Sequence, residues 1–399
     1  MKTLDYFLKY ITFNTQSSEE NISSPSSENQ TLLAKEIVSD LISLGYKSAY
    51  IDEFSQVHLF INGLDGLETI GLNAHMDTAT DYSGENVKYQ IIENYDLKDI
   101  KLNDHLTLSP SVFEILNNFK GKTLITTSGD TLLGADDKAG ISIIMNVLRF
   151  LKENPNFKHH PLSILFTCDE EVGRGAEHFD NNIFKADYAF TVDGASPLSV
   201  SHENFYAASV MVNIKGISVH PGEAKGKLIN ALLLANELIN NIDFTFVPES
   251  TSGYEGYIFL NGIEGNNAEA NLYFIARDFE ADELDKQCEK ITSKVDILRN
   301  KYPSCSFGYN VRYQYKNMNP IFKNKPQALN KIDKAFKSLG LNYIKEPIRG
   351  GTDGATFSYK GCPTPNLGTG SYNHHGPYEF LVKEEHDLMI EIIKEIIKA

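Results

Sequence analysis

Apolar and polar positions along the first half of the chain follow two alternating patterns. Between about residues 55 and 200, short apolar runs typical of buried strands are separated by segments with helical spacing. The clearest helical segment carries apolar residues at i, i+3, i+4 and i+7, which would share one face; they are Ile141, Ile144, Met145 and Leu148. Strands that alternate with helices predict an α/β fold with a mainly parallel mixed sheet flanked by helices.

The pattern changes after residue 205. Residues 208–214 and 271–277 alternate apolar and polar side chains with a period of two, and each is followed by a segment of helical spacing. Two such strand-and-helix units predict a smaller α/β sandwich inserted at 206–318, a common size for a domain. Residues 1–205 and 319–399 would then form one discontinuous domain. Inserted domains that cover a crevice often act as lids.

The first 50 residues predict two helices that flank a polar loop. The loop runs from about Gln16 to Asn29 and is rich in Ser, Glu, Asn and Gln. This composition is typical of connecting segments. We therefore expect the loop to be surface-exposed or mobile.

Charge and composition narrow the classes of partner. The formal net charge of −16 argues against nucleic acid or an anionic membrane as partner, because both select clustered Lys and Arg. The four cysteines have no CxxC spacing and predict free thiols in a reducing compartment. The N-terminus does not read as a signal peptide, and no apolar run approaches the ~18 residues that a membrane span needs. These features predict a cytoplasmic protein.

Side chains that can bind metal ions lie in short motifs, several of which follow apolar runs. In an open α/β sheet, ligands collect in the crevice at the carboxyl ends of the strands. One imidazole per metal ion with shared carboxylates is typical of two-metal hydrolysis. The motifs therefore predict a metallohydrolase. The candidate residues are His75 and Asp77, Asp136 and Asp137, Glu170 and Glu171, Asp193, and His374 and His375.

The first two motifs each have two interpretations. Residues i and i+2 of a strand project to the same side, so Asp77 could brace the His75 ring and fix its tautomer. Alternatively, a backbone carbonyl satisfies the ring. Asp136 and Asp137 lie between small residues, which favours close backbone approach around a metal ion. A helix N-terminus would explain their charge but not the glycine on either side.

The acidic triplet 169–171 gives the strongest indication of chemistry. Three acids after a buried apolar run would repel one another without a cation. Adjacent glutamates can also divide the work, one binding metal while the other accepts a proton from water as general base. A solvated acidic loop is the alternative. Asp193 is ambiguous by itself, and the sequence hardly separates His374 from His375 as the second imidazole.

Together these motifs resemble the peptidase T family, the tripeptide aminopeptidases of the dizinc exopeptidase superfamily that includes aminoacylases. The resemblance runs over nearly the whole chain. It rests on residues 75–78, 131–140, 169–173, 188–194 and 347–355, and in the inserted domain on 203–205, 219–222, 253–256 and 275–279. The catalytic motifs are shared by the superfamily, whereas the arginine and lid motifs point to peptidase T. Cys168 departs slightly from the family, which often has proline before the acidic triplet, but it touches no assigned role.

The resemblance implies a metal centre with two Zn²⁺ ions in each subunit. The implied ligands are His75, Asp136 and Asp193 for one ion, and Asp136, Glu171 and His375 for the other. Asp136 would bridge the two ions. Glu170 would be the general base, and Asp77 would be the partner of His75.

The resemblance also assigns roles to the inserted domain, as a lid and dimerisation domain. His220 matches a histidine that reaches the active site of the partner subunit in a homodimer and stabilises the oxyanion. Arg277 and Arg349 match positions that hold the substrate carboxylate and backbone. Judged by residue type alone, His220 before Pro-Gly would be a surface turn residue, and Arg277 could be an ordinary salt-bridge partner.

The predicted activity is metal-dependent release of the N-terminal residue from short peptides, tripeptides in particular. A related dizinc dipeptidase or N-acyl amino acid deacylase would share all five ligands, so the metal motifs do not separate these activities. The lid and arginine motifs favour the tripeptidase. A non-catalytic binding homologue is the alternative from another class, but such relatives usually lose ligands or the base, and this chain retains all of them.

Overall fold

The computed structural model describes residues 2–399 and divides into two compact units. The first unit is Met1–His202, Met318–Glu346 and Thr352–Ala399, and the second is Glu203–Asn317 with Pro347–Gly351. Residue 1, where the predicted first domain begins, lies outside the described residues.

An eight-stranded mixed sheet forms the centre of the first unit. Its strand order is β1-β2-β8-β3-β9-β16-β10-β15. The central neighbours β8, β3, β9 and β16 pair in parallel. Strand β2 runs antiparallel to both of its neighbours, whereas β10 runs antiparallel to β16 and parallel to β15. The bounds are β1 (Tyr50–Ile51), β2 (Val57–Ile61), β8 (Leu162–Thr167), β3 (Ile70–His75), β9 (Tyr188–Val192), β16 (Asn366–Leu367), β10 (Ser199–Ser201) and β15 (Ile344–Lys345).

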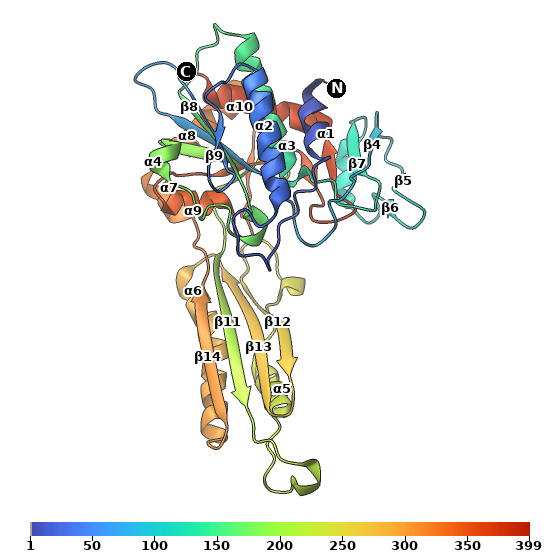
Figure 1. The fold of residues 1–399 in the computed structure, drawn as a ribbon, viewed down its shortest axis with the longest axis vertical. Coiled ribbons are helices and arrows are strands. Elements are labelled where there is room, and N and C mark those ends of the chain that lie inside the picture. The colour runs from blue at the N-terminus through green and yellow to red at the C-terminus, as the bar shows by residue number, and fades with distance from the viewer. Residues whose placement is uncertain (1) are drawn as a thin grey trace. The chain divides into compact units, whose positions relative to one another are not determined.

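The central strands are covered on both faces. Every residue of β3, β8 and β9 is buried, as expected for parallel strands with helices on either side. The helices of this unit are α1 (Asp5–Tyr10), α2 (Glu28–Ser43), α3 (Ala135–Glu153), α4 (Asn181–Phe184), α7 (Asn319–Asn324), α8 (Gln327–Ser338), α9 (Asp353–Tyr359) and α10 (Lys383–Ile397) (Figure 1). Helix α3 packs on β3 and also against α1 and α10, which explains why it is buried on more than one face. The predicted α/β fold class is confirmed.

A second, antiparallel sheet of four strands also belongs to the first unit. Its order is β17 (Ser371–Tyr372), β18 (Phe380–Val382), β7 (Leu124–Thr127) and β4 (Tyr89–Ile92). The short strands β5 (Ile100–Lys101) and β6 (Thr107–Leu108) pair nearby in sequence. Strand β7 leads into the loop before α3, and β18 follows the two late histidines, so this sheet anchors both segments.

The second unit is an antiparallel sheet with two helices packed on one face. The strands are ordered β12 (Tyr257–Gly265), β13 (Glu269–Asp278), β11 (Tyr206–Lys215) and β14 (Ser306–Tyr313), with α5 (Ala231–Asn241) and α6 (Ala281–Lys301) against them (Figure 1). Alternate residues of β13 are buried, and their side chains join those of α5 and α6 in one apolar core. The period-two pattern of the sequence therefore marks the face that the helices cover.

The unit boundaries differ slightly from the predicted ranges, since residues 203–205 group with the second unit and Met318 with the first, and a short separate segment differs as well. Residues 347–351 were expected in the first domain, but the structure groups them with the second unit. The reason is the Arg349 side chain, which donates hydrogen bonds to the carbonyls of Gly253 and Glu255 and to the Thr251 hydroxyl. These contacts attach the segment to the loop before β12.

Within residues 2–399, no helix is both long and apolar enough to cross a membrane.

Candidate metal centre

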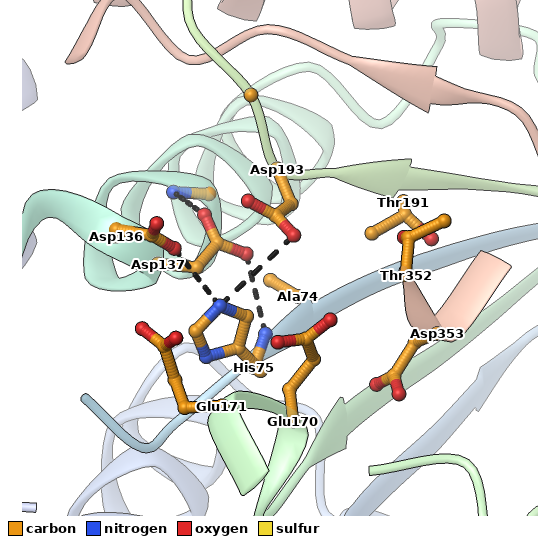
Figure 2. Close-up of polar contacts among 12 residues, drawn as sticks. Ala74, His75, Asp136, Asp137, Glu170, Glu171, Thr191, Asp193, Thr352 and Asp353 are labelled. Carbon is orange, nitrogen blue, oxygen red and sulfur yellow. Dashed lines mark hydrogen bonds and ion pairs between the residues drawn. The ribbon is translucent and has the colours of Figure 1, made fainter. Parts of the chain in front are cut away.

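The candidate ligands gather where the central strands of the first unit end. His75 is the last residue of β3, Asp193 directly follows β9, and Glu170 and Glu171 lie in the single 3-10 turn η3 (Glu170–Val172) just after β8. Asp136 lies in the first turn of α3. Figure 2 shows the carboxylates of these acids, and that of Asp137, arranged around the His75 ring. The strand-end placement explains how residues from distant parts of the chain meet.

Both ring nitrogens of His75 are engaged, and on opposite sides. Nδ1 lies 3.1 Å from the Asp77 carbonyl and 3.4 Å from Asp77 Oδ1, whereas Nε2 lies 2.9 Å from Asp136 Oδ1 and 4.0 Å from Asp193 Oδ2. Burial disfavours the charged ring, but hydrogen bonds to Asp136 and Asp77 outweigh it and raise the pKa of His75 well above its usual range. Asp77 therefore orients the ring so that Nε2 faces the carboxylates.

Glu379 holds the backbone that leads to Asp136. Its buried carboxylate accepts hydrogen bonds from three backbone N–H groups, those of Leu133 (2.7 Å), Gly134 (2.8 Å) and Asp136 (3.0 Å). Gly134 adopts a left-handed φ of 79°, which a residue with a Cβ rarely tolerates. The Glu379 contacts and the turn at Gly134 aim the Asp136 side chain into the cluster while the chain enters α3. The Asp136–Asp137 peptide bond is cis.

The Asp137 carboxylate also lies beside His75, but both of its oxygens accept hydrogen bonds from backbone. One oxygen accepts the N–H of His75 at 3.2 Å, and the other accepts the N–H of Gly140 at 3.1 Å. A Cβ at Gly140 would lie 1.9 Å from the Val192 carbonyl oxygen, so only glycine fits there. The glycine that follows the two aspartates thus permits α3 to approach β9, in agreement with the close backbone approach expected from the sequence.

The two glutamates are half-buried in a strongly acidic environment. Burial raises the pKa of Glu170 well above its usual range. The His75 ring opposes this shift, whereas the carboxylates of Asp353, Asp193 and Glu171 add to it. Burial and the nearby Asp136 carboxylate raise the pKa of Glu171 to about 7, and the same two causes raise that of Asp193 to about 6. Carboxyl groups with raised pKa values in one buried site indicate that a compensating positive charge belongs there.

The late histidines both approach the bridging candidate Asp136. His374 Nδ1 lies 3.4 Å and His375 Nε2 3.5 Å from Asp136 Oδ2. His375 Nε2 also lies 3.1 Å from Glu171 Oε2, whereas His374 Nε2 is 2.8 Å from the Ser371 hydroxyl. Only His375 of this pair therefore contacts two candidate ligands.

Within residues 2–399, the donor set fits a divalent cation in two overlapping groups that both use His75. Two groups have ligand atoms within 4.8 Å of one another, His75 with Asp136 and Glu171, and His75 with Asp137 and Asp193. The second group contains Asp137, a candidate by its motif that is not among the ligands implied by the family resemblance. Glu171 Oε1 is buried and has no hydrogen-bond partner among residues 2–399, so an acceptor oxygen remains for a cation. Imidazole and carboxylate donors of this kind suit zinc.

The other predicted site residues lie in the second unit. His220 is exposed, and its Nδ1 accepts a hydrogen bond from the Gly222 N–H at 3.1 Å. Arg277 donates from Nη1 to the carbonyls of Ala208 and Ala276, and its guanidinium lies over the Tyr315 ring.

Comparison with known proteins gives the family. Residues 128–399 match the model of peptidase family M20/M25/M40. Peptidase T of Desulfitobacterium hafniense is 44% identical over 398 residues, covering 99% of this chain and 97% of that protein. The chain belongs to peptidase family M20/M25/M40, in its peptidase T group.

Two solved structures with low sequence identity share the fold. Aminopeptidase PepT from Bacillus cereus superposes with a TM-score of 0.77 at 20% identity, covering 99% of this chain and 97% of that one. A dinuclear metal binding peptidase of the M20 family from Bacillus subtilis superposes with a TM-score of 0.65 at 14% identity, covering 99% and 97%. The family resemblance predicted from the motifs is confirmed, and the chain is a peptidase.

Several residues that support the centre of this M20 member were missed from the sequence. Glu379 follows His375 by four positions, but its backbone partners are more than 240 residues away along the chain. Gln30 directly follows the loop expected to be surface-exposed or mobile, in the first turn of α2, and it is buried against Asp169. For Glu379, the sequence offered one weak indication of a buried role, namely an acidic residue directly before the apolar run Phe380-Leu381-Val382.

Proposed function

We propose that this M20 peptidase is a two-zinc aminopeptidase that releases the N-terminal residue from tripeptides. The observation that carries the proposal is the meeting of His75, Asp136 and Glu171 at the strand ends, beside the half-buried Glu170. Peptidase T relatives aligned over almost the full length support the substrate class.

The proposed ligands are His75, Asp136 and Asp193 for one ion, and Asp136, Glu171 and His375 for the other. The two oxygens of Asp136 support a bridging role, because Oδ1 faces His75 Nε2 and Oδ2 faces His375 Nε2. Asp137 has both oxygens on backbone N–H groups, so it supports the loop rather than a metal ion. Bound zinc ions would polarise the scissile carbonyl and acidify a water molecule.

Glu170 is the proposed general base. It accepts a proton from the attacking water and then delivers that proton to the leaving amine, so the N-terminal residue departs with a new carboxylate and the shortened peptide with a free amine. Its backbone N–H is held by Asp77 Oδ1 at 3.0 Å, and the same carboxylate orients His75. The Asp77 carboxylate therefore positions both the proposed base Glu170 and the proposed ligand His75.

The second unit would supply oxyanion and carboxylate binding in a homodimer. Because Gly222 N–H donates to His220 Nδ1, a neutral His220 ring carries its proton on Nε2, where it can donate to a developing oxyanion. Arg277 uses Nη1 for backbone carbonyls and keeps donors for a substrate carboxylate, which suits a guanidinium well. Arg349, proposed with it, already holds the loop Thr251–Glu255, so its contribution to substrate binding would be the smaller one. The cytoplasmic location stays a prediction from the sequence.

A substrate panel tests the proposal. Purified protein would be assayed with di-, tri- and tetrapeptides and N-acyl amino acids at several zinc concentrations. We expect tripeptides to be cleaved with the highest kcat/KM and the N-terminal residue to be the first product. Preference for dipeptides or N-acyl amino acids would instead assign the chain to one of the related activities. No hydrolysis of any substrate with zinc bound would indicate a non-catalytic homologue.

A further inference from the structure

Two side chains, Gln30 and Asp77, hold the acidic turn after β8 by accepting hydrogen bonds from three successive backbone N–H groups of the turn. Asp169 N–H donates to Gln30 Oε1 at 3.0 Å, Glu170 N–H to Asp77 Oδ1 at 3.0 Å, and Glu171 N–H to Asp77 Oδ2 at 3.1 Å. Asp169 adopts a left-handed φ of 63°, a conformation that costs energy for most residues with a Cβ and is best tolerated by Asn and Asp. The direction in which Glu170 and Glu171 leave this turn therefore depends on how Asp169 is held.

The Asp169 side chain forms hydrogen bonds with a segment near the N-terminus of the chain, at Ser26 and Gln30. Its carboxylate accepts hydrogen bonds from the Ser26 N–H (2.9 Å to Oδ2), the Ser26 hydroxyl (2.5 Å to Oδ1) and Gln30 Nε2 (2.7 Å to Oδ1). All three residues are buried. Gln30 thus pairs reciprocally with Asp169, donating to its carboxylate and accepting from its backbone N–H. Burying a carboxylate is costly unless it is paired in this way.

We name residues 15–30 the N-terminal strap. Gln16 Nε2 donates to the carbonyls of Ala79, Thr80 and Tyr82, and Ser17 N–H donates to the Thr78 carbonyl. The expected surface exposure of this polar loop holds for residues 19–23, whereas Ser17 and Ser26 are buried and bind the loops after β3 and β8. The strap therefore joins the segment that follows His75 to the turn that carries Glu170.

We propose that Asp169 is a positioning residue, clamped by Ser26 and Gln30 of the strap, which fixes the directions of Glu170 and Glu171 in the metal centre. The inference rests on the proposed roles of those two glutamates. The Asp77 carboxylate binds the N–H groups of Glu170 and Glu171, and the strap binds Asp169 through Ser26 and Gln30. Loss of either set of hydrogen bonds would let the turn relax from the left-handed conformation at Asp169.

A polarity swap tests the clamp. Asp169→Asn keeps the left-handed preference but brings an amide N–H₂ against either Gln30 Nε2 or the Ser26 N–H. Gln30→Glu places a second carboxylate beside Asp169. In the double variant, the new amide at position 169 can donate to the new carboxylate at position 30 and still accept the Ser26 N–H. We expect each single change to lower both zinc affinity and kcat by about 10- to 100-fold, as for other groups that orient metal ligands, and the double variant to recover most of the loss.

The matched control is Glu19→Gln, which removes one negative charge from an exposed position of the same strap. We expect it to behave as the unmodified protein. Zinc affinity would be measured by chelator competition, and hydrogen exchange of a peptide spanning 168–172 would be measured in the metal-free protein. Faster exchange in the single variants and recovery in the double variant support the clamp independently of activity. Thermal unfolding of each variant identifies samples that are not folded.

The outcomes separate this inference from the proposed function. Single variants with unchanged zinc affinity and unchanged exchange would overturn the clamp, as would a double variant no better than either single one. If no peptide is hydrolysed by the unmodified protein, the proposed function fails, but zinc affinity and exchange still decide whether Asp169 positions the turn.

Discussion

The strand-end cluster of the first unit and the His220 turn of the second unit differ in how firmly their side chains are held. His75, Asp77 and Asp169 are buried, and each makes hydrogen bonds to groups distant in sequence. His220 is exposed beside the short turn η4 (Pro221–Glu223), and within residues 2–399 its ring has one hydrogen bond, from Gly222 two positions away.

The difference indicates two kinds of contribution. In the strand-end cluster, one side chain supports several others, so a substitution there should change metal binding as well as turnover. The His220 ring can leave its position at little cost, so a substitution there should change only the chemical step. Substitutions in the two regions test whether metal binding and the chemical step respond differently.

The largest effect is expected for Asp136→Ala. A bridging ligand serves both ions, so we expect both zinc ions and all measurable turnover to be lost. His375→Ala removes a ligand of one ion and should first weaken that ion alone. Elemental analysis of dialysed samples makes the comparison. Two zinc ions retained by Asp136→Ala would mean that Asp136 does not bridge.

Glu170→Gln should reduce turnover while the metal content stays near normal. The amide keeps the size of the side chain but cannot accept the proton of the attacking water. A loss of about 10²–10⁴ in kcat is the scale for a general base. Kinetics and zinc analysis on the same sample give the answer, and near-normal kcat would remove Glu170 from this role.

His220→Ala should lower kcat by about 10²–10³ and leave zinc content unchanged, because an oxyanion donor acts in the transition state. Mixing this variant with Glu170→Gln under subunit exchange should restore activity, since a heterodimer contains one complete site. Exchange can be followed by mass spectrometry of differently labelled subunits. No recovery despite exchange would show that His220 does not act across a dimer.

Glu379→Gln should have the smallest effect of the four. The amide oxygen can still accept the N–H groups of Leu133 and Gly134, but the N–H₂ group then faces the Asp136 N–H, which leaves a donor against a donor. We expect zinc affinity to fall about tenfold. Glu391→Gln on the exposed surface of α10 is the control. Equal affinities for the two variants would leave Glu379 without a role in the centre.

Sequence reasoning worked where a single local rule decides the structure. Buried strands followed by acids or histidine predicted the meeting of His75, Glu170 and Asp193, because parallel strands bring their carboxyl ends to one edge. The period of two along β11 and β13 predicted the second unit for the same kind of reason, since one face of that sheet packs against helices.

Sequence reasoning failed where long-range side-chain contacts decide the structure. Gln30 and Ser26 look like ordinary loop residues until Asp169 approaches, 139 residues beyond Gln30. The substrate-binding role of Arg349 stays a prediction from the resemblance, but the sequence did not indicate that this side chain also donates three hydrogen bonds to the loop at Thr251–Glu255. Neither contact follows from spacing, because both depend on how distant loops meet.

Zinc titration of the metal-free protein, with tripeptide turnover and bound zinc followed together, tests the central claim most directly. We expect turnover to be absent without metal and to reach its maximum when two zinc ions are bound per chain. Full turnover in the presence of excess chelator, or a maximum with no bound zinc, would contradict this claim.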